Sequence, residues 1–110
     1  MNEKQILIQL DKIKTREVSE QGAASILREI SLREDPETRD LRTYILHEQL
    51  ITSPLPMVRA AAAAGLRGLH NESSTRHLRQ AWVREEDSRL KNFIRKVLDE
   101  LLRSREYSWE

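Results

Sequence analysis

The side chains in this sequence that best suit catalysis or metal binding are three histidines and one run of carboxylates. Histidine ligands on a helix bind a metal when they converge from one face, often at a spacing of about three to five residues. His70 and His77 are seven residues apart across a predicted turn, and His47 belongs to another predicted helix. We therefore interpret all three as ordinary surface histidines, and we expect no metal and no other cofactor.

The carboxylate run is Glu85-Glu86-Asp87, inside the segment REEDSR. Two carboxylates do acid–base chemistry when burial or close pairing shifts the pKa of one of them. This run falls in a predicted turn between two helices, where Asp87 is placed to cap the helix that follows. The sequence also contains no glycine-rich phosphate loop and no Ser/His/Asp set. We expect a protein that is not an enzyme.

Composition narrows the class of protein further. The chain has 110 residues, 34% of them charged, and a formal net charge of +1. That is the size of one domain, and the charge gives no bulk attraction to nucleic acid or to a membrane. There is no cysteine, and the N-terminal apolar run Ile6 to Ile8 is too short for a signal peptide or a membrane span. We expect a cytoplasmic protein without a membrane partner.

Helical periodicity runs through the whole chain. Apolar residues recur every three or four positions, and no alternating strand pattern competes. We predict an all-α fold with helix N-caps at Asn2, Asp35 and Asp87. The predicted helices cover about residues 3–14, 18–33, 36 to the break at TSPLP, 56–69, 74–85 and 88–104. Residues 1–105 then form a single domain, and residues 106–110 form a C-terminal tail.

Residues 45–69 and 77–101 repeat each other. When ILHEQLITSPLPMVRAAAAAGLRGL is placed above HLRQAWVREEDSRLKNFIRKVLDEL, the apolar positions coincide without a gap at a constant offset of 32. The aligned pairs are Leu46 with Leu78, Leu50 with Trp82, Val58 with Leu90, Arg59 with Lys91, Leu66 with Leu98 and Leu69 with Leu101. A constant offset predicts two stacked helical hairpins, and the helices at 3–14 and 18–33 form a degenerate first one.

The predicted helix at 56–69 carries five consecutive alanines followed by Gly65. We interpret these small residues as a helix that other helices approach from several sides. A glycine inside a helix costs about 1 kcal/mol relative to alanine. We therefore interpret Gly65 as the position where a neighbouring helix approaches most closely. The residues predicted to face inward are Val58, Ala62, Gly65, Leu66 and Leu69, and those predicted to face away are Ala60, Ala63 and Arg67.

The segment PMVRAAAAAGLRGL, together with the turn and hairpin after it, resembles HEAT-like repeats, and in particular the short repeats of the phycobilin lyase family. Val58-Arg59 and the alanines match that family's second helix, whereas Gly65 stands where an alanine is common. The resemblance implies an α–α superhelix of three short hairpins. It also implies a ladder in which Arg59 pairs with Asp87 of the next unit, with Lys91 in the place equivalent to Arg59.

The outer side of the second helices is predicted to line a concave surface, as it does in HEAT-like stacks. The predicted binding residues on this surface are Gln21, Arg28, Arg67, Asn92, Arg95 and Asp99. Arg28, Arg67 and Arg95 would form a basic stripe over a groove floored by alanine, suited to an acidic protein segment or to a phosphate backbone. The alternative interpretation is a solvated charged face.

The last predicted helix is apolar over a broader arc than one neighbouring hairpin covers. Either the tail residues Tyr107 and Trp109 fold over it beside Leu102, or a second chain docks there as a homodimer. We expect a non-enzymatic scaffold that binds another protein through the groove or through this end. A nucleic-acid-binding module that uses the arginine stripe is the first alternative. A lyase-type accessory subunit, implied only by the family resemblance, is the second.

Overall fold

The computed structural model describes residues 2–69 and 73–107, with the side chains of 2–69 and 74–103. Within these ranges the chain forms six α-helices and one 3-10 turn, and no strand. The elements are α1 (Glu3–Lys14), α2 (Glu20–Leu32), the 3-10 turn (Pro36–Thr38), α3 (Arg39–Thr52), α4 (Pro56–Leu69), α5 (Ser73–Arg84) and α6 (Ser88–Tyr107). The predicted all-α fold is confirmed.

Side-chain caps fix where several helices begin. The side chains and backbone N–H groups of Asn2 and Gln5 form a reciprocal capping box at α1. Asp87 Oδ1 accepts a hydrogen bond from Leu90 N at 3.0 Å and so caps α6. The prediction for Asp35 is wrong, because its side chain makes no capping hydrogen bond and a 3-10 turn separates it from α3. Local capping therefore sets the start of α1 and α6, whereas another interaction must hold the α2–α3 connection.

That connection is held by Arg42, a buried arginine of α3 that is only 2% exposed. Its guanidinium donates to Asp35 O at 2.7 Å and to Thr38 Oγ1 at 3.0 Å. It also donates to the carbonyl oxygens of Ile30 and Arg33 at the end of α2. Burial lowers the pKa of Arg42, although the nearby Asp35 acts in the opposite direction. Arg42 thus supplies the donors that the end of α2 lacks.

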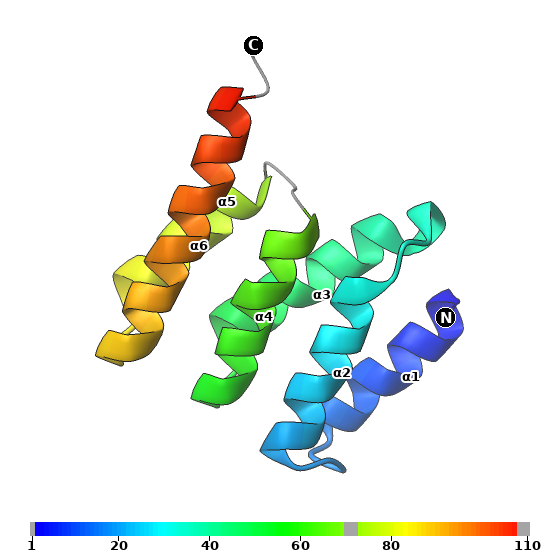
Figure 1. Ribbon diagram of the computed structural model, residues 1–110. Coiled ribbons are helices and arrows are strands. Elements are labelled where there is room, and N and C mark those ends of the chain that lie inside the picture. The colour runs from blue at the N-terminus through cyan, green and yellow to red at the C-terminus, as the bar shows by residue number, and fades with distance from the viewer. Residues whose placement is uncertain (1, 70–72, 108–110) are drawn as a thin grey trace.

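The helices form two layers, which Figure 1 shows with α2, α4 and α6 side by side in front of α1, α3 and α5. Each front helix packs against the helix that precedes it in the chain, and α4 also packs against α2 and α6. The chain is therefore a row of three helical hairpins. We call α2, α4 and α6 the second helices.

The repeat predicted from the sequence is present in the element boundaries. α3 and α5 end at Thr52 and Arg84, and α4 and α6 begin at Pro56 and Ser88, in each case 32 residues apart. The aligned apolar residues are buried in both copies, except that Trp82 is only partly buried. α6 runs on through Tyr107, and so includes the first two residues of the segment predicted to be a tail.

α4 is enclosed on several sides, as its small residues predicted. All five residues predicted to face inward are buried. A Cβ atom built on Gly65 would lie 2.9 Å from Ser31 Cβ of α2 and 3.1 Å from both Leu46 methyl carbons of α3. The prediction that Ala63 faces away is wrong, because Ala63 is fully buried. Because α4 contacts α2, α3 and α6, it is buried over a wider arc than the single apolar stripe of an ordinary surface helix.

Candidate binding groove

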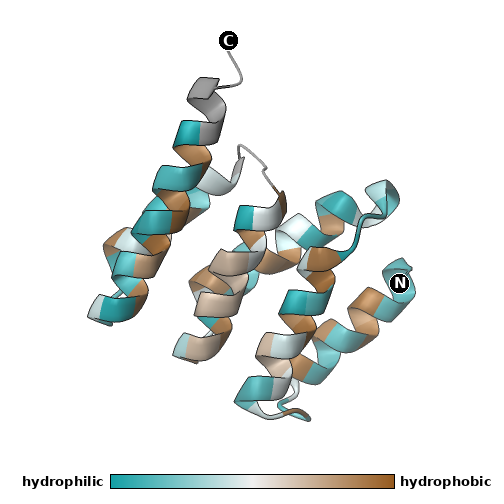
Figure 2. Cartoon of the chain, in the orientation of Figure 1, coloured by the Kyte–Doolittle hydropathy of each residue, from teal (hydrophilic) through white to brown (hydrophobic). Residues whose placement is uncertain are grey.

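An open groove of about 610 Å³ lies on the layer of second helices. We call it the α4 groove, because four small residues of α4 form its floor. The floor residues are Ala60, Ala61, Ala64 and Gly65. The rest of the lining comes from Ala24, Ser25, Arg28, Ser31 and Leu32 of α2, Met57 of α4 and Phe93 of α6. In Figure 2 the alanine segment of α4 is pale brown between the more strongly coloured helices on either side.

The groove exposes large apolar side chains along its borders. Leu32 is 72% exposed and Met57 is 42% exposed. Phe93, on the opposite border, is partly buried against the core. The lining thus combines a floor of alanines with exposed leucine and methionine side chains.

Arg28 is the one charged residue in this lining. Its side chain is exposed, and within the described ranges no carboxylate lies at ion-pair distance from it. The adjacent Glu29 forms an ion pair with Arg33 instead, at 3.2 Å. The groove therefore offers a single uncompensated positive charge among apolar groups.

The other two arginines of the predicted stripe are neutralised by acidic residues. Arg67 Nε lies 2.7 Å from Glu100 Oε2, and its guanidinium lies over the Phe93 ring at 5.5 Å. Arg95 Nε lies 3.2 Å from Asp99 Oδ1. The prediction of a continuous basic stripe is thus wrong, because α6 places acidic residues beside both arginines.

The remaining predicted binding residues do not line the α4 groove. Gln21 is exposed near the start of α2, outside the lining. Asn92, Arg95 and Asp99 line a separate hollow of about 350 Å³ on α6. Of the six predicted binding residues, only Arg28 belongs to the groove. Sequence periodicity missed Leu32 and Met57, which lie at helix ends where exposure depends on the neighbouring helix.

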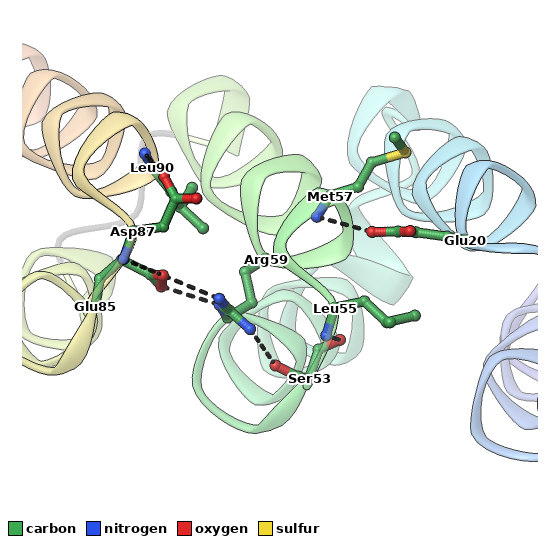
Figure 3. A network of polar contacts seen from close by, with 8 residues as sticks. All are labelled: Glu20, Ser53, Leu55, Met57, Arg59, Glu85, Asp87 and Leu90. Atoms are coloured by element: carbon green, nitrogen blue, oxygen red, sulfur yellow. Dashed lines mark hydrogen bonds and ion pairs between the residues drawn. The ribbon is translucent and has the colours of Figure 1, made fainter.

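A polar network along one edge of the layer holds the second helices together (Figure 3). Arg59 of α4 donates from Nε and Nη2 to the two carboxylate oxygens of Glu85, both at 2.9 Å. The prediction that Asp87 pairs with Arg59 is therefore wrong. The Asp87 carboxylate caps α6, and Glu85 pairs with Arg59 instead. Lys91, which the resemblance puts in the place equivalent to Arg59, has its ammonium 5.0 Å from the centre of the Trp82 ring and forms no ion pair with a described carboxylate.

The network continues on both sides of Arg59. Its Nη1 donates to Ser53 O at 3.0 Å, in the turn before α4. Glu20 Oε1 in the first turn of α2 accepts from Met57 N at 3.3 Å, which satisfies a free N–H at the start of α4. These contacts link the start of α4 to the first turn of α2 on one side and to the α5–α6 turn on the other.

The histidine prediction is wrong for His47, which is buried between α3 and α5. His47 Nε2 lies 3.0 Å from Ser74 Oγ, and its ring stacks on His77 with 3.7 Å between the centroids. Burial, with a smaller contribution from His77, lowers the pKa of His47 to about 4. His70 lies outside the described residues. The described residues contain no group of three or more side chains that could hold a metal ion.

The apolar arc of α6 is covered largely by the chain itself. Leu90, Ile94, Val97, Leu98 and Leu101 are buried, and Leu102 and Phe93 are partly buried against the same core. α4 and α5 both pack on α6 and account for this burial. The predicted interface residues Trp109 and Tyr107 cannot be placed there, since Trp109 and the Tyr107 side chain lie outside the described part of the chain.

None of the described helices combines the length and the apolar content needed to cross a membrane. Comparison of the chain with protein-family models, curated proteins and solved structures finds no match.

Proposed function

We propose that this protein is a non-enzymatic binding module that accepts a segment of another protein in the α4 groove. The observation that carries the proposal is the exposure of Leu32 and Met57 beside a floor of alanines. Covering such surface contributes roughly 25 cal/mol per Å² of apolar area removed from water. As part of the same proposal, the three stacked hairpins are of the HEAT-like kind.

The groove chemistry favours a protein over the alternatives. A nucleic-acid surface needs several uncompensated cations to displace the counterions of the phosphates, whereas the α4 groove offers only Arg28. An enzyme or lyase accessory needs convergent polar groups in an enclosed site, whereas the polar side chains of this lining are Ser25, Arg28 and Ser31.

Matched glutamate substitutions test the proposal. Ala64→Glu places a charge on the groove floor at an exposed helical position, and Val83→Glu does the same on α5, at a residue that does not line the groove. Proteins recovered from extracts of the source cell on the wild-type chain are purified, and their affinity for each variant is measured. We expect Ala64→Glu to weaken binding by about tenfold or more, and Val83→Glu to leave it unchanged.

Duplex DNA and single-stranded RNA are measured alongside, at about 50 and about 200 mM salt. A partner bound equally by wild type and Ala64→Glu would contradict the proposal. Nucleic-acid binding that weakens steeply with salt and disappears in Arg28→Glu would also contradict the proposal.

A further inference from the structure

We propose that the occupant of the α4 groove is an amphipathic α-helix of about two turns, with an acidic residue between two apolar anchors. This inference rests on the proposed function and names the class of partner segment.

The length of the groove matches a short helix. Its lining runs from Met57 to Gly65 on α4 and from Ala24 to Leu32 on α2, which is eight residue steps along each helix. At 1.5 Å per residue this is about 12 Å. Side chains at positions i and i+7 of a helix share a face and lie about 10.5 Å apart. Two anchors at that spacing reach the Met57 end and the Leu32 end of the groove.

The lack of hydrogen-bonding groups in the groove disfavours an extended peptide. Where the groove buries its backbone, an extended segment leaves N–H and C=O groups unpaired at a cost of about 1–3 kcal/mol each. The lining has three polar side chains, and Ser31 already donates its hydroxyl proton to Arg28 O at 2.7 Å. Every lining residue lies in a helix, so the groove presents no strand edge to pair with. A helical occupant satisfies its own backbone.

The small residues of the floor allow a helix to lie close to α4. Helix axes pack about 8–10 Å apart, and the shorter distance requires small side chains at the contact. Ala60, Ala61, Ala64 and Gly65 form such a contact surface over adjacent turns of α4. Apolar side chains of the occupant then reach the borders formed by Leu32, Met57 and Phe93.

The charge of the groove selects an acidic residue. Arg28 lies on α2 midway between Ala24 and Leu32, four residues from each. The adjacent Glu29 is engaged with Arg33, and so it does not neutralise Arg28. A carboxylate on the helix between the two anchors pairs with Arg28 at the border of an apolar surface.

A displayed library of helical peptides of about 16 residues tests the inference, with selections on wild type and on Arg28→Glu. We expect wild type to enrich peptides with apolar residues seven apart and Asp or Glu between them. We expect Arg28→Glu to bind these peptides at least about fivefold more weakly and to enrich Lys or Arg at the same position. Circular dichroism and melting curves confirm that the variant folds.

The outcomes separate this inference from the proposed function. Enriched peptides that lose binding to Ala64→Glu, but that show no acidic preference or are extended, overturn the inference and leave the proposed function in place. Peptides that bind Ala64→Glu as well as wild type, or a selection that enriches nothing over a bare support, overturn both.

Discussion

Gly65 of α4 lies so close to Ser31 of α2 that a Cβ atom built on the glycine would be 2.9 Å from Ser31 Cβ. Ser31 Cβ is bound directly to the backbone, so neither side of this contact can yield without moving a helix. The same stretch of α4 forms the floor of the groove. Close packing inside the layer and a groove on its surface thus come from one run of small residues.

The two glycines of α4 are predicted to respond in opposite directions to alanine. Gly65→Ala meets Ser31 and Leu46, and overpacking of this kind costs about 1–3 kcal/mol, more than the gain of about 1 kcal/mol in helix propensity. Gly68→Ala meets nothing within 4 Å and is expected to stabilise by about 0.5–1 kcal/mol. Urea unfolding measures both free energies. Equal stabilisation by the two substitutions would contradict the packing described.

Arg59→Ala is predicted to destabilise the fold by about 2 kcal/mol, since it leaves the Glu85 carboxylate buried without its partner. The Glu85 side chain is only 6% exposed. Arg33→Ala breaks the exposed pair with Glu29 and is expected to change stability by less than about 0.5 kcal/mol. A double-mutant cycle on Arg59 and Glu85 measures their coupling, and a coupling of zero would show that this link does not hold the edge.

Stability is predicted to fall as the pH drops from about 6.5 to about 4, through the protonation of His47. The pKa of His47 is lower in the folded state than in the unfolded state, so the unfolded chain binds the proton first and acid favours unfolding. The loss is at most about 3 kcal/mol. Urea midpoints across this pH range measure it. His47→Gln, which titrates no proton here, is expected to show a shallower decline, and an unchanged slope would sink the assignment.

Arg42→Met is predicted to cost about 3 kcal/mol or more, although methionine has a similar reach. The substitution leaves the carbonyl groups of Ile30, Arg33 and Asp35 without this donor, and each unpaired buried group costs about 1–3 kcal/mol. Thermal melts measure the effect. Arg28→Met on the exposed face of α2 is the control and is expected to unfold like wild type. Equal melting temperatures for the two variants would mean that Arg42 does not hold the α2–α3 connection.

The repeated spacing of apolar residues was enough to predict the helices, the hairpin repeat and the packing role of Gly65. The helices follow from local periodicity and the hairpins from the constant offset of 32 residues, both of which the sequence displays directly. Gly65 was recognisable because a glycine inside a helix is unfavourable unless space requires it.

The polar contacts could not be predicted in the same way. Glu85 and Asp87 are only two residues apart in the sequence. Which of the two carboxylates lies beside Arg59 depends on where α5 ends, which is at Arg84. Arg42 is one of 14 arginines, and nothing in its immediate sequence marks it as buried. Arg67 of α4 pairs with Glu100 of α6, a helix that does not follow α4 directly in the chain. Each of these contacts depends on how the helices sit against one another, which residue spacing alone does not determine.

An amide chemical-shift map of the labelled protein with a peptide selected on the wild-type chain shows directly whether the α4 groove is the binding site. We expect the largest shifts at the groove residues Ala24, Arg28, Ala60, Ala64 and Phe93, and no change at Tyr44 and Val83 on the other layer. Shifts concentrated on α1, α3 and α5 instead would show that the alanine floor of α4 is not where this protein binds its partner.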